Sequence, residues 1–117
     1  MDKERNEKPE KSPWGKVDYV QPLAAGAYVV STPSHGGLML DQVQAARLSP
    51  PARAKGEGWG TWLCFEEDCR IAVPLIELED LRTATGIDRA DLLRTATDYD
   101  ADYLEAVGVD SIAKATV

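Results

Sequence analysis

The sequence has little of several residue types that metal and catalytic sites need. Its 117 residues include a single histidine, His35, two cysteines and one phenylalanine. One histidine leaves no second imidazole for a zinc site, and the Cys64-x₄-Cys69 spacing is not a usual zinc-ligand spacing. The residues therefore predict no metal centre, no cofactor and no recognisable catalytic set.

Long apolar stretches are also absent. No run approaches the roughly 20 residues of a membrane-spanning helix. The N-terminal string MDKERNEKPEKSP lacks the apolar region of a secretory signal. We therefore expect a cytoplasmic protein without a membrane partner, in which Cys64 and Cys69 are reduced thiols. The spacing leaves open whether the two thiols meet.

Acidic charge is concentrated in one half of the chain. Residues 66–110 hold 13 acidic and four basic side chains, a net charge of −9, whereas the whole chain carries −7. Nucleic acids and anionic membranes bind basic surfaces, so we expect no direct binding to either. A strongly acidic half favours a basic partner instead.

The pattern along the chain predicts a flexible charged tail at residues 1–13 and a single α+β domain at residues 14–117. Three β-rich stretches, at residues 17–23, 27–31 and 38–40, predict a small N-terminal antiparallel sheet of about three strands. Helices are expected to pack on this sheet. Lys55–Gly58 is expected to be a loop.

Capping residues and spacing locate the helices. Asp41 suits the N-cap of a helix over residues 42–48. Ser49-Pro50-Pro51 ends that helix, and the same three residues suit the start of a further turn. Four further helices are expected. The first runs from near Glu66 to a break at Pro74, and the second covers residues 78–85 and ends at Gly86. The third begins at Asp88 and continues past Ala96, and the fourth covers Tyr99–Val107 and ends at Gly108, with Tyr99, Tyr103 and Ala106 on one face.

The string Thr32-Pro33-Ser34-His35-Gly36-Gly37 is the most distinctive motif. One interpretation is a hairpin turn in which Pro33 fixes φ and the two glycines supply positive φ. The other is a functional turn in which hydroxyl and imidazole groups bind an anion or perform nucleophilic chemistry. The candidate residues of this motif site are Thr32, Ser34, His35, Gly36, Gly37, Glu67 and Asp68.

Several acidic side chains have no evident role in starting a helix. They are either a solvated face or a docking surface for a basic partner. An EF-hand calcium loop is excluded, because a loop starting at Asp98 would need glycine at Tyr103 and glutamate at Val109. The candidate partner-binding residues are Glu77, Glu79, Asp80, Asp98, Asp100, Asp102 and Glu105.

The aromatic residues Trp59, Trp62 and Phe65 recur at intervals of three. Such a stripe belongs either to the core or to a partner-binding patch, and the core needs them in a chain of this length. We expect them in the core.

A wider pattern consists of three strings: Trp14-Gly15-x-x-Asp18, the S-T-P-S-H-G-G string of Ser31–Gly37, and Glu66-Glu67-Asp68-Cys69. From Trp14 to Pro74 the chain resembles an uncharacterised family of small domains encoded by bacterial plasmids and phages, sometimes beside antirestriction-type domains. The resemblance implies no catalytic residues. It implies a mobile-element setting, where small acidic proteins often block host defence.

Charge and resemblance together predict an anti-defence protein of the anti-CRISPR or antirestriction type. It would bind a basic host protein or nucleoprotein complex through its acidic surface, in the manner of a DNA mimic. Two alternatives stay open: a small enzyme that uses the Ser34/His35 turn, and a phage or plasmid assembly module. The oligomeric state, monomer or small homo-oligomer, is also open.

Overall fold

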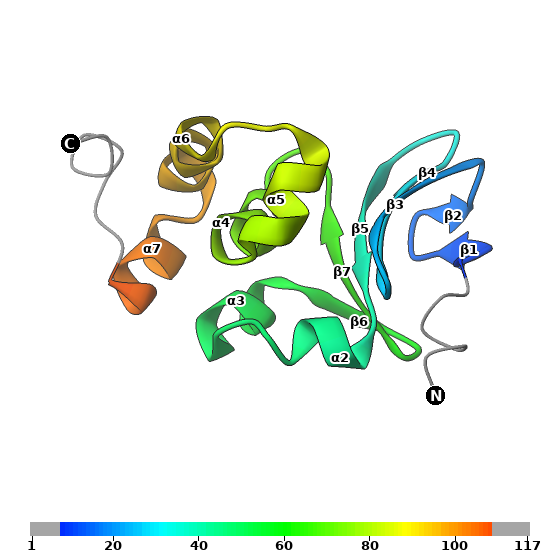
Figure 1. The fold of residues 1–117 in the computed structure, drawn as a ribbon, viewed down its shortest axis with the longest axis horizontal. Helices are drawn as coiled ribbons and strands as arrows, with labels where there is room; N and C mark the ends of the chain where they lie inside the picture. Colours follow the sequence, from blue (N-terminus) through cyan, green and yellow to red (C-terminus); the bar gives the residue numbers. More distant parts are fainter. Residues whose placement is uncertain (1–7, 109–117) are drawn as a thin grey trace.

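A five-stranded antiparallel sheet forms the centre of the fold in the computed structural model, which describes residues 8–108 (Figure 1). The strands run in the order β3-β4-β5-β7-β6, and β1 pairs with β2 in a separate small sheet. The strands are β1 (Lys11–Ser12), β2 (Gly15–Lys16), β3 (Tyr19–Ala24), β4 (Ala27–Ser31), β5 (Gly36–Leu40), β6 (Glu57–Trp59) and β7 (Trp62–Glu66).

Six helices complete the described part of the chain. Two short ones lie between β5 and β6, and four follow β7 in succession. They are α2 (Gln42–Ala45), α3 (Pro50–Lys55), α4 (Ala72–Glu77), α5 (Glu79–Thr85), α6 (Arg89–Tyr99) and α7 (Ala101–Val107). Within residues 8–108, none of them has the length and apolar content needed to cross a membrane.

The two faces of the sheet bury different side chains, because successive strand residues point to opposite sides. Leu38 and Phe65 face the helices and join the larger core, whereas Val30, Met39 and Cys64 face the other side. The helices lie on one side of the sheet, and the β1–β2 segment lies on the other (Figure 1). All five residues of β5 are buried. Both layers therefore depend on β5.

The helix boundaries follow the capping chemistry of the sequence. The Asp41 carboxylate accepts a hydrogen bond from the Gln44 amide at 2.8 Å and caps α2. The Ser49 hydroxyl accepts from the Ala52 amide at 3.2 Å and caps α3. Gly86, with a φ of 78°, ends α5 in the left-handed conformation. The predicted starts of α2 and α3 and the predicted end of α5 are confirmed.

The sheet is larger than the sequence predicted. The fold class is α+β, but the main sheet has five strands where about three were expected. Glu57–Trp59 forms β6 where a loop was expected, and Trp62–Glu66 forms β7. The prediction of a helix from near Glu66 is therefore wrong. Pro74 lies in the first turn of α4, where the missing amide hydrogen costs no hydrogen bond.

Three further expectations differ from the structure. Tyr99 ends α6 and is 66% exposed, whereas Tyr103 on α7 is 1% exposed, so the predicted common face is wrong. Gly36 and Gly37 belong to β5 and do not have positive φ. Lys11 and Ser12, within the stretch predicted as a tail, pair with Lys16 and Gly15.

The aromatic stripe divides between the two layers. Phe65 is completely buried in the larger core, as expected. Trp59 and Trp62 are opposite each other on β6 and β7 and pack, partly buried, on the other layer. The ring of Trp62 meets that of Tyr28 edge-on, with 6.0 Å between centroids. The interval between Trp59 and Trp62 thus comes from a hairpin, whereas Trp62 and Phe65 lie on opposite faces of β7.

Candidate functional site

The Thr32–Gly37 motif connects β4 to β5, and the Thr32 side chain organises it. The Thr32 hydroxyl donates to the His35 carbonyl at 2.6 Å, with the Trp14 carbonyl 3.2 Å away. It also accepts from the amides of Ser34 at 3.3 Å and His35 at 3.1 Å. Its geometry is that of a side-chain-stabilised turn. Thr32 therefore fixes the backbone on which Ser34 and His35 are presented.

The two glycines of the motif allow close packing of backbone. A Cβ atom on Gly37 would collide with the Phe65 carbonyl on β7 and with the Trp14 ring. A Cβ on Gly36 would collide with the Val30 carbonyl on β4. Both glycines are therefore required by the narrow space between neighbours, and the predicted role in supplying positive φ is wrong.

The same corner brings together the three separated strings of the sequence pattern. The Glu67 amide donates to the Gly36 carbonyl at 3.0 Å, which joins the end of β7 to the start of β5. Ser34 donates to the Trp14 carbonyl at 3.5 Å. Trp14, the Thr32–Gly37 motif and the turn after Glu66 thus form one structural unit, which we call the motif corner.

In the motif corner the Ser34 hydroxyl donates to a backbone carbonyl, that of Trp14. Ser34 and His35 are exposed, and within residues 8–108 the Ser34 hydroxyl has only the Trp14 carbonyl as hydrogen-bond partner. A nucleophilic serine needs its hydroxyl directed at a base, which is in turn oriented by a third group. Glu67 and Asp68 are also exposed and contribute no such orientation within the described chain. The geometry supports the structural interpretation of the motif.

A half-open cavity of about 480 Å³ adjoins the motif corner. Trp14 and both cysteines line it, together with Lys55 and Arg70. Burial raises the pKa of the Cys64 thiol to about 12, with Glu57 adding to the effect. Cys64 is therefore protonated at neutral pH. Cys64 is buried, whereas Cys69 is only partly buried. Neither cysteine is in a disulfide in this structure.

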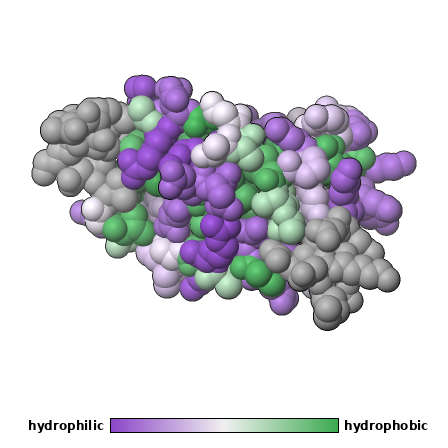
Figure 2. All heavy atoms as spheres, viewed as in Figure 1, coloured by the Kyte–Doolittle hydropathy of each residue, from purple (hydrophilic) through white to green (hydrophobic). Residues whose placement is uncertain are grey.

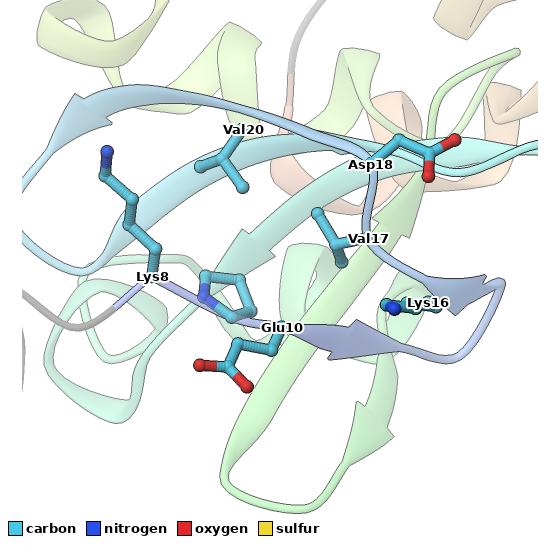
Figure 3. A pocket seen from close by; sticks show the side chains of 7 residues that line it. Lys8, Glu10, Lys16, Val17, Asp18 and Val20 are labelled. Carbon is cyan, nitrogen blue, oxygen red and sulfur yellow. The ribbon is translucent and has the colours of Figure 1, made fainter.

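A second hollow lies between the N-terminal segment and β3 (Figure 3). It has a volume of about 710 Å³ and contains none of the predicted site residues. Two lysines and two carboxylates surround an apolar floor that includes Val17 and Val20. Its charges are mixed, so it does not select a ligand of either sign.

Glu77, the first of the seven candidate acidic residues, holds three elements together. Its carboxylate accepts hydrogen bonds from the Ser49 amide at 2.8 Å and from the Ser49 hydroxyl at 2.6 Å. It also accepts from the Tyr103 hydroxyl at 2.8 Å. Burial and this carboxylate raise the pKa of Tyr103 far above its ordinary value. Glu77 therefore joins the end of α4 to the start of α3 and to α7.

Asp100, between α6 and α7, is completely buried. Its Oδ1 atom lies 3.4 Å from Lys55 Nζ and 3.2 Å from Arg70 Nε. Within residues 8–108, neither carboxylate oxygen accepts a hydrogen bond. Two cations thus compensate the buried charge by proximity. Asp100 is inaccessible to a partner, so its predicted place in a binding surface is wrong.

Two other candidates are exposed but form ion pairs. Asp102 lies 2.9 Å from Lys55, whose hydrogen bond lowers the pKa of that carboxyl group. Asp80 lies 2.8 Å from Arg47, whose hydrogen bond lowers the pKa of Asp80 in the same way. The cations come from outside residues 66–110, so the fold neutralises part of the acidic half. No sequence signal indicated Arg47 or Lys55.

The remaining three candidates are exposed and form no ion pair with residues 8–108. Glu79 lies at the start of α5, Asp98 near the end of α6 and Glu105 on α7. Hydrophilic side chains cover much of the helical half in the view of Figure 2. Among the described residues, no group of three or more His, Cys, Asp or Glu side chains is placed to hold a metal ion.

A family model described as a domain of unknown function, DUF7007, matches residues 7–116. The chain belongs to this family. The DUF7007 match includes the motif corner, the cavity beside it and all the helices described above. No curated protein and no solved structure matches the chain.

Proposed function

We propose that this DUF7007 domain is an anti-defence protein of a phage or plasmid that acts in the cytoplasm of its bacterial host. It binds a basic protein or nucleoprotein complex of a nucleic-acid-targeting defence system, of the anti-CRISPR or antirestriction type, and competes there with nucleic acid. The observation that carries the proposal is the acidic charge of the helical half. Residues 66–110 carry −9.

The carboxylates available to a partner are fewer than the sequence predicted. Glu77 and Asp100 have structural roles, and Asp80 and Asp102 are paired. Among the seven candidates, the residues that are exposed and form no ion pair within residues 8–108 are Glu79, Asp98 and Glu105, which we call the free acidic set. Its members lie on three successive helices.

The free acidic set should act mainly on the rate of association. An exposed ion pair contributes less than about 1 kcal/mol at equilibrium. A field of one sign accelerates encounter with an oppositely charged partner by about tenfold or more at low salt, and salt screens this effect. Neutralising the set should therefore slow association at low salt and leave dissociation nearly unchanged.

The test compares two variants of equal charge. The first, which we call the helical variant, carries Glu79→Gln, Asp98→Asn and Glu105→Gln. The control carries Glu10→Gln, Asp18→Asn and Glu57→Gln, three exposed positions outside the helical half. Each protein is expressed in cells whose restriction or CRISPR system targets an incoming plasmid, and transformation efficiency is measured.

We expect the wild-type chain and the control to raise transformation and the helical variant to lose most of that effect. With a purified defence complex, association of the helical variant should be about tenfold slower at low salt. Equal protection by both variants would refute the acidic surface. No protection by the wild-type chain in any such system would refute the anti-defence function itself.

A further inference from the structure

Two thiols that are separated in sequence by a strand end and a turn line the same cavity. Cys64 lies in β7 and points away from the helices, as does Glu66 two residues later. After Glu66 the chain turns back on itself, because the Ile71 amide donates to the Glu66 carbonyl at 2.9 Å. Cys69 lies within this turn and faces the cavity that Cys64 also lines.

We propose that Cys64 and Cys69 form a redox-responsive thiol pair, which a hydroperoxide converts into a disulfide within the folded chain. Neither residue belongs to the free acidic set, so the pair is independent of the proposed function. Both side chains line the same cavity beside the end of β7, and a disulfide joins Cα atoms about 4.4–6.8 Å apart. No ion or cofactor is needed.

The exposure of the two thiols assigns their roles. Cys64 is 2% exposed, whereas Cys69 is only partly buried. Peroxide therefore meets Cys69 first. Cys69 is the peroxide-reactive thiol and Cys64 is the resolving thiol.

The chemistry balances in two steps. The Cys69 thiolate attacks one oxygen of the peroxide, the O–O bond breaks, and Cys69 becomes a sulfenic acid while hydroxide or an alkoxide leaves. The Cys64 sulfur then attacks the Cys69 sulfur, the S–O bond breaks, and the sulfenic oxygen leaves as water with the proton of Cys64. Peroxide is reduced by two electrons, and the two thiols are oxidised to one disulfide.

The experiment treats the folded wild-type chain with hydrogen peroxide and follows its mass. We expect the loss of two hydrogen atoms, reversed by a dithiol reductant. Cleavage after Glu66 or Glu67 should leave two peptides joined through Cys64 and Cys69. The rate should not change over an about tenfold range of protein concentration, because the reaction is intramolecular.

Two variants separate the roles. Cys64→Ala should accumulate the Cys69 sulfenic acid, which dimedone traps, and Cys69→Ser should stay unoxidised under the same conditions. Circular dichroism verifies that each variant is folded, and the wild-type result stands without them. Three outcomes would overturn the proposal: covalent dimers without an internal bond, a Cys69 sulfinic acid as the only product, or an internal disulfide that forms only after unfolding.

Discussion

Glu77 gives the sharpest test of the assignments within the acidic half. The sequence placed this side chain in a partner-binding surface. In the structure its carboxylate accepts three hydrogen bonds, two from Ser49 and one from Tyr103. We therefore predict that Glu77→Ala lowers stability, because it separates three helices that the carboxylate joins.

The expected loss follows from the number of bonds and from the burial of the carboxylate. Hydrogen bonds to a charged acceptor contribute about 1.5–3 kcal/mol each. The three bonds share one half-buried carboxylate, so their contributions are not additive. We therefore use the low end of the range for each bond and reduce the sum, which gives a loss of about 3 kcal/mol in total. With a urea slope of about 2 kcal/mol per molar, the midpoint should fall by about 1.5 M. Tryptophan fluorescence during urea unfolding measures it.

Glu79→Ala is the matched control, because Glu79 is exposed and only two residues away. Its loss should stay below about 1 kcal/mol, the scale of a charge at a helix start. Tyr103→Phe should cost about 1 kcal/mol alone and almost nothing further when Glu77 is already alanine. A Glu77→Ala midpoint within experimental error of the Glu79→Ala midpoint would refute the three-helix connection.

Four other predictions test the motif corner and the cavity. Gly37→Ala should lower the free energy of unfolding by about 1–3 kcal/mol through overpacking, whereas Gly58→Ala, which meets no neighbouring atom within 4 Å, should change it far less; thermal melting compares them. Native alkylation near pH 8 should modify Cys69 and spare Cys64, whose buried thiol has a pKa of about 12. Because the pKa of Cys64 is higher in the folded chain, folding favours the protonated thiol. The stability that this protonation contributes should be complete below the unfolded pKa near 9.0 and should be lost as the pH rises to about 12. Urea titrations across that pH range would detect the loss. His35→Ala should change stability by less than about 0.5 kcal/mol and leave anti-defence activity intact, since the side chain is exposed; loss of that activity would restore the functional interpretation of the turn.

Local chemistry in the sequence predicted the helix boundaries well. Asp41, Ser49 and Gly86 act within a few residues of themselves, and each has the role that its side chain or its lack of one favours. The prediction of three strands from β3 to β5 had the same basis, because adjacent strands are joined by short turns. Features that depend on neighbours in the chain could therefore be predicted from the sequence.

Features that depend on residues distant in the chain could not be predicted from the sequence. β7 pairs with β5 across an intervening segment that holds both short helices, and its aromatic residues showed a helix-like spacing. The burial of Asp100 depends on Lys55 and Arg70, which nothing near it in the sequence indicates. The candidate acidic surface was too large for the same reason, since the cations that neutralise it come from elsewhere.

The position of β7 has a consequence for synthesis of the chain. β7 is the strand that covers the second edge of β5, and it follows β5 by more than 20 residues. A nascent or truncated chain that stops before Trp62 exposes that edge, with the apolar side chains of Leu38 and Leu40 beside it. Uncovered apolar edges pair with other chains and aggregate. Premature termination within the α2–α3 region should therefore yield insoluble fragments, and a usable shorter form of this domain must retain β7.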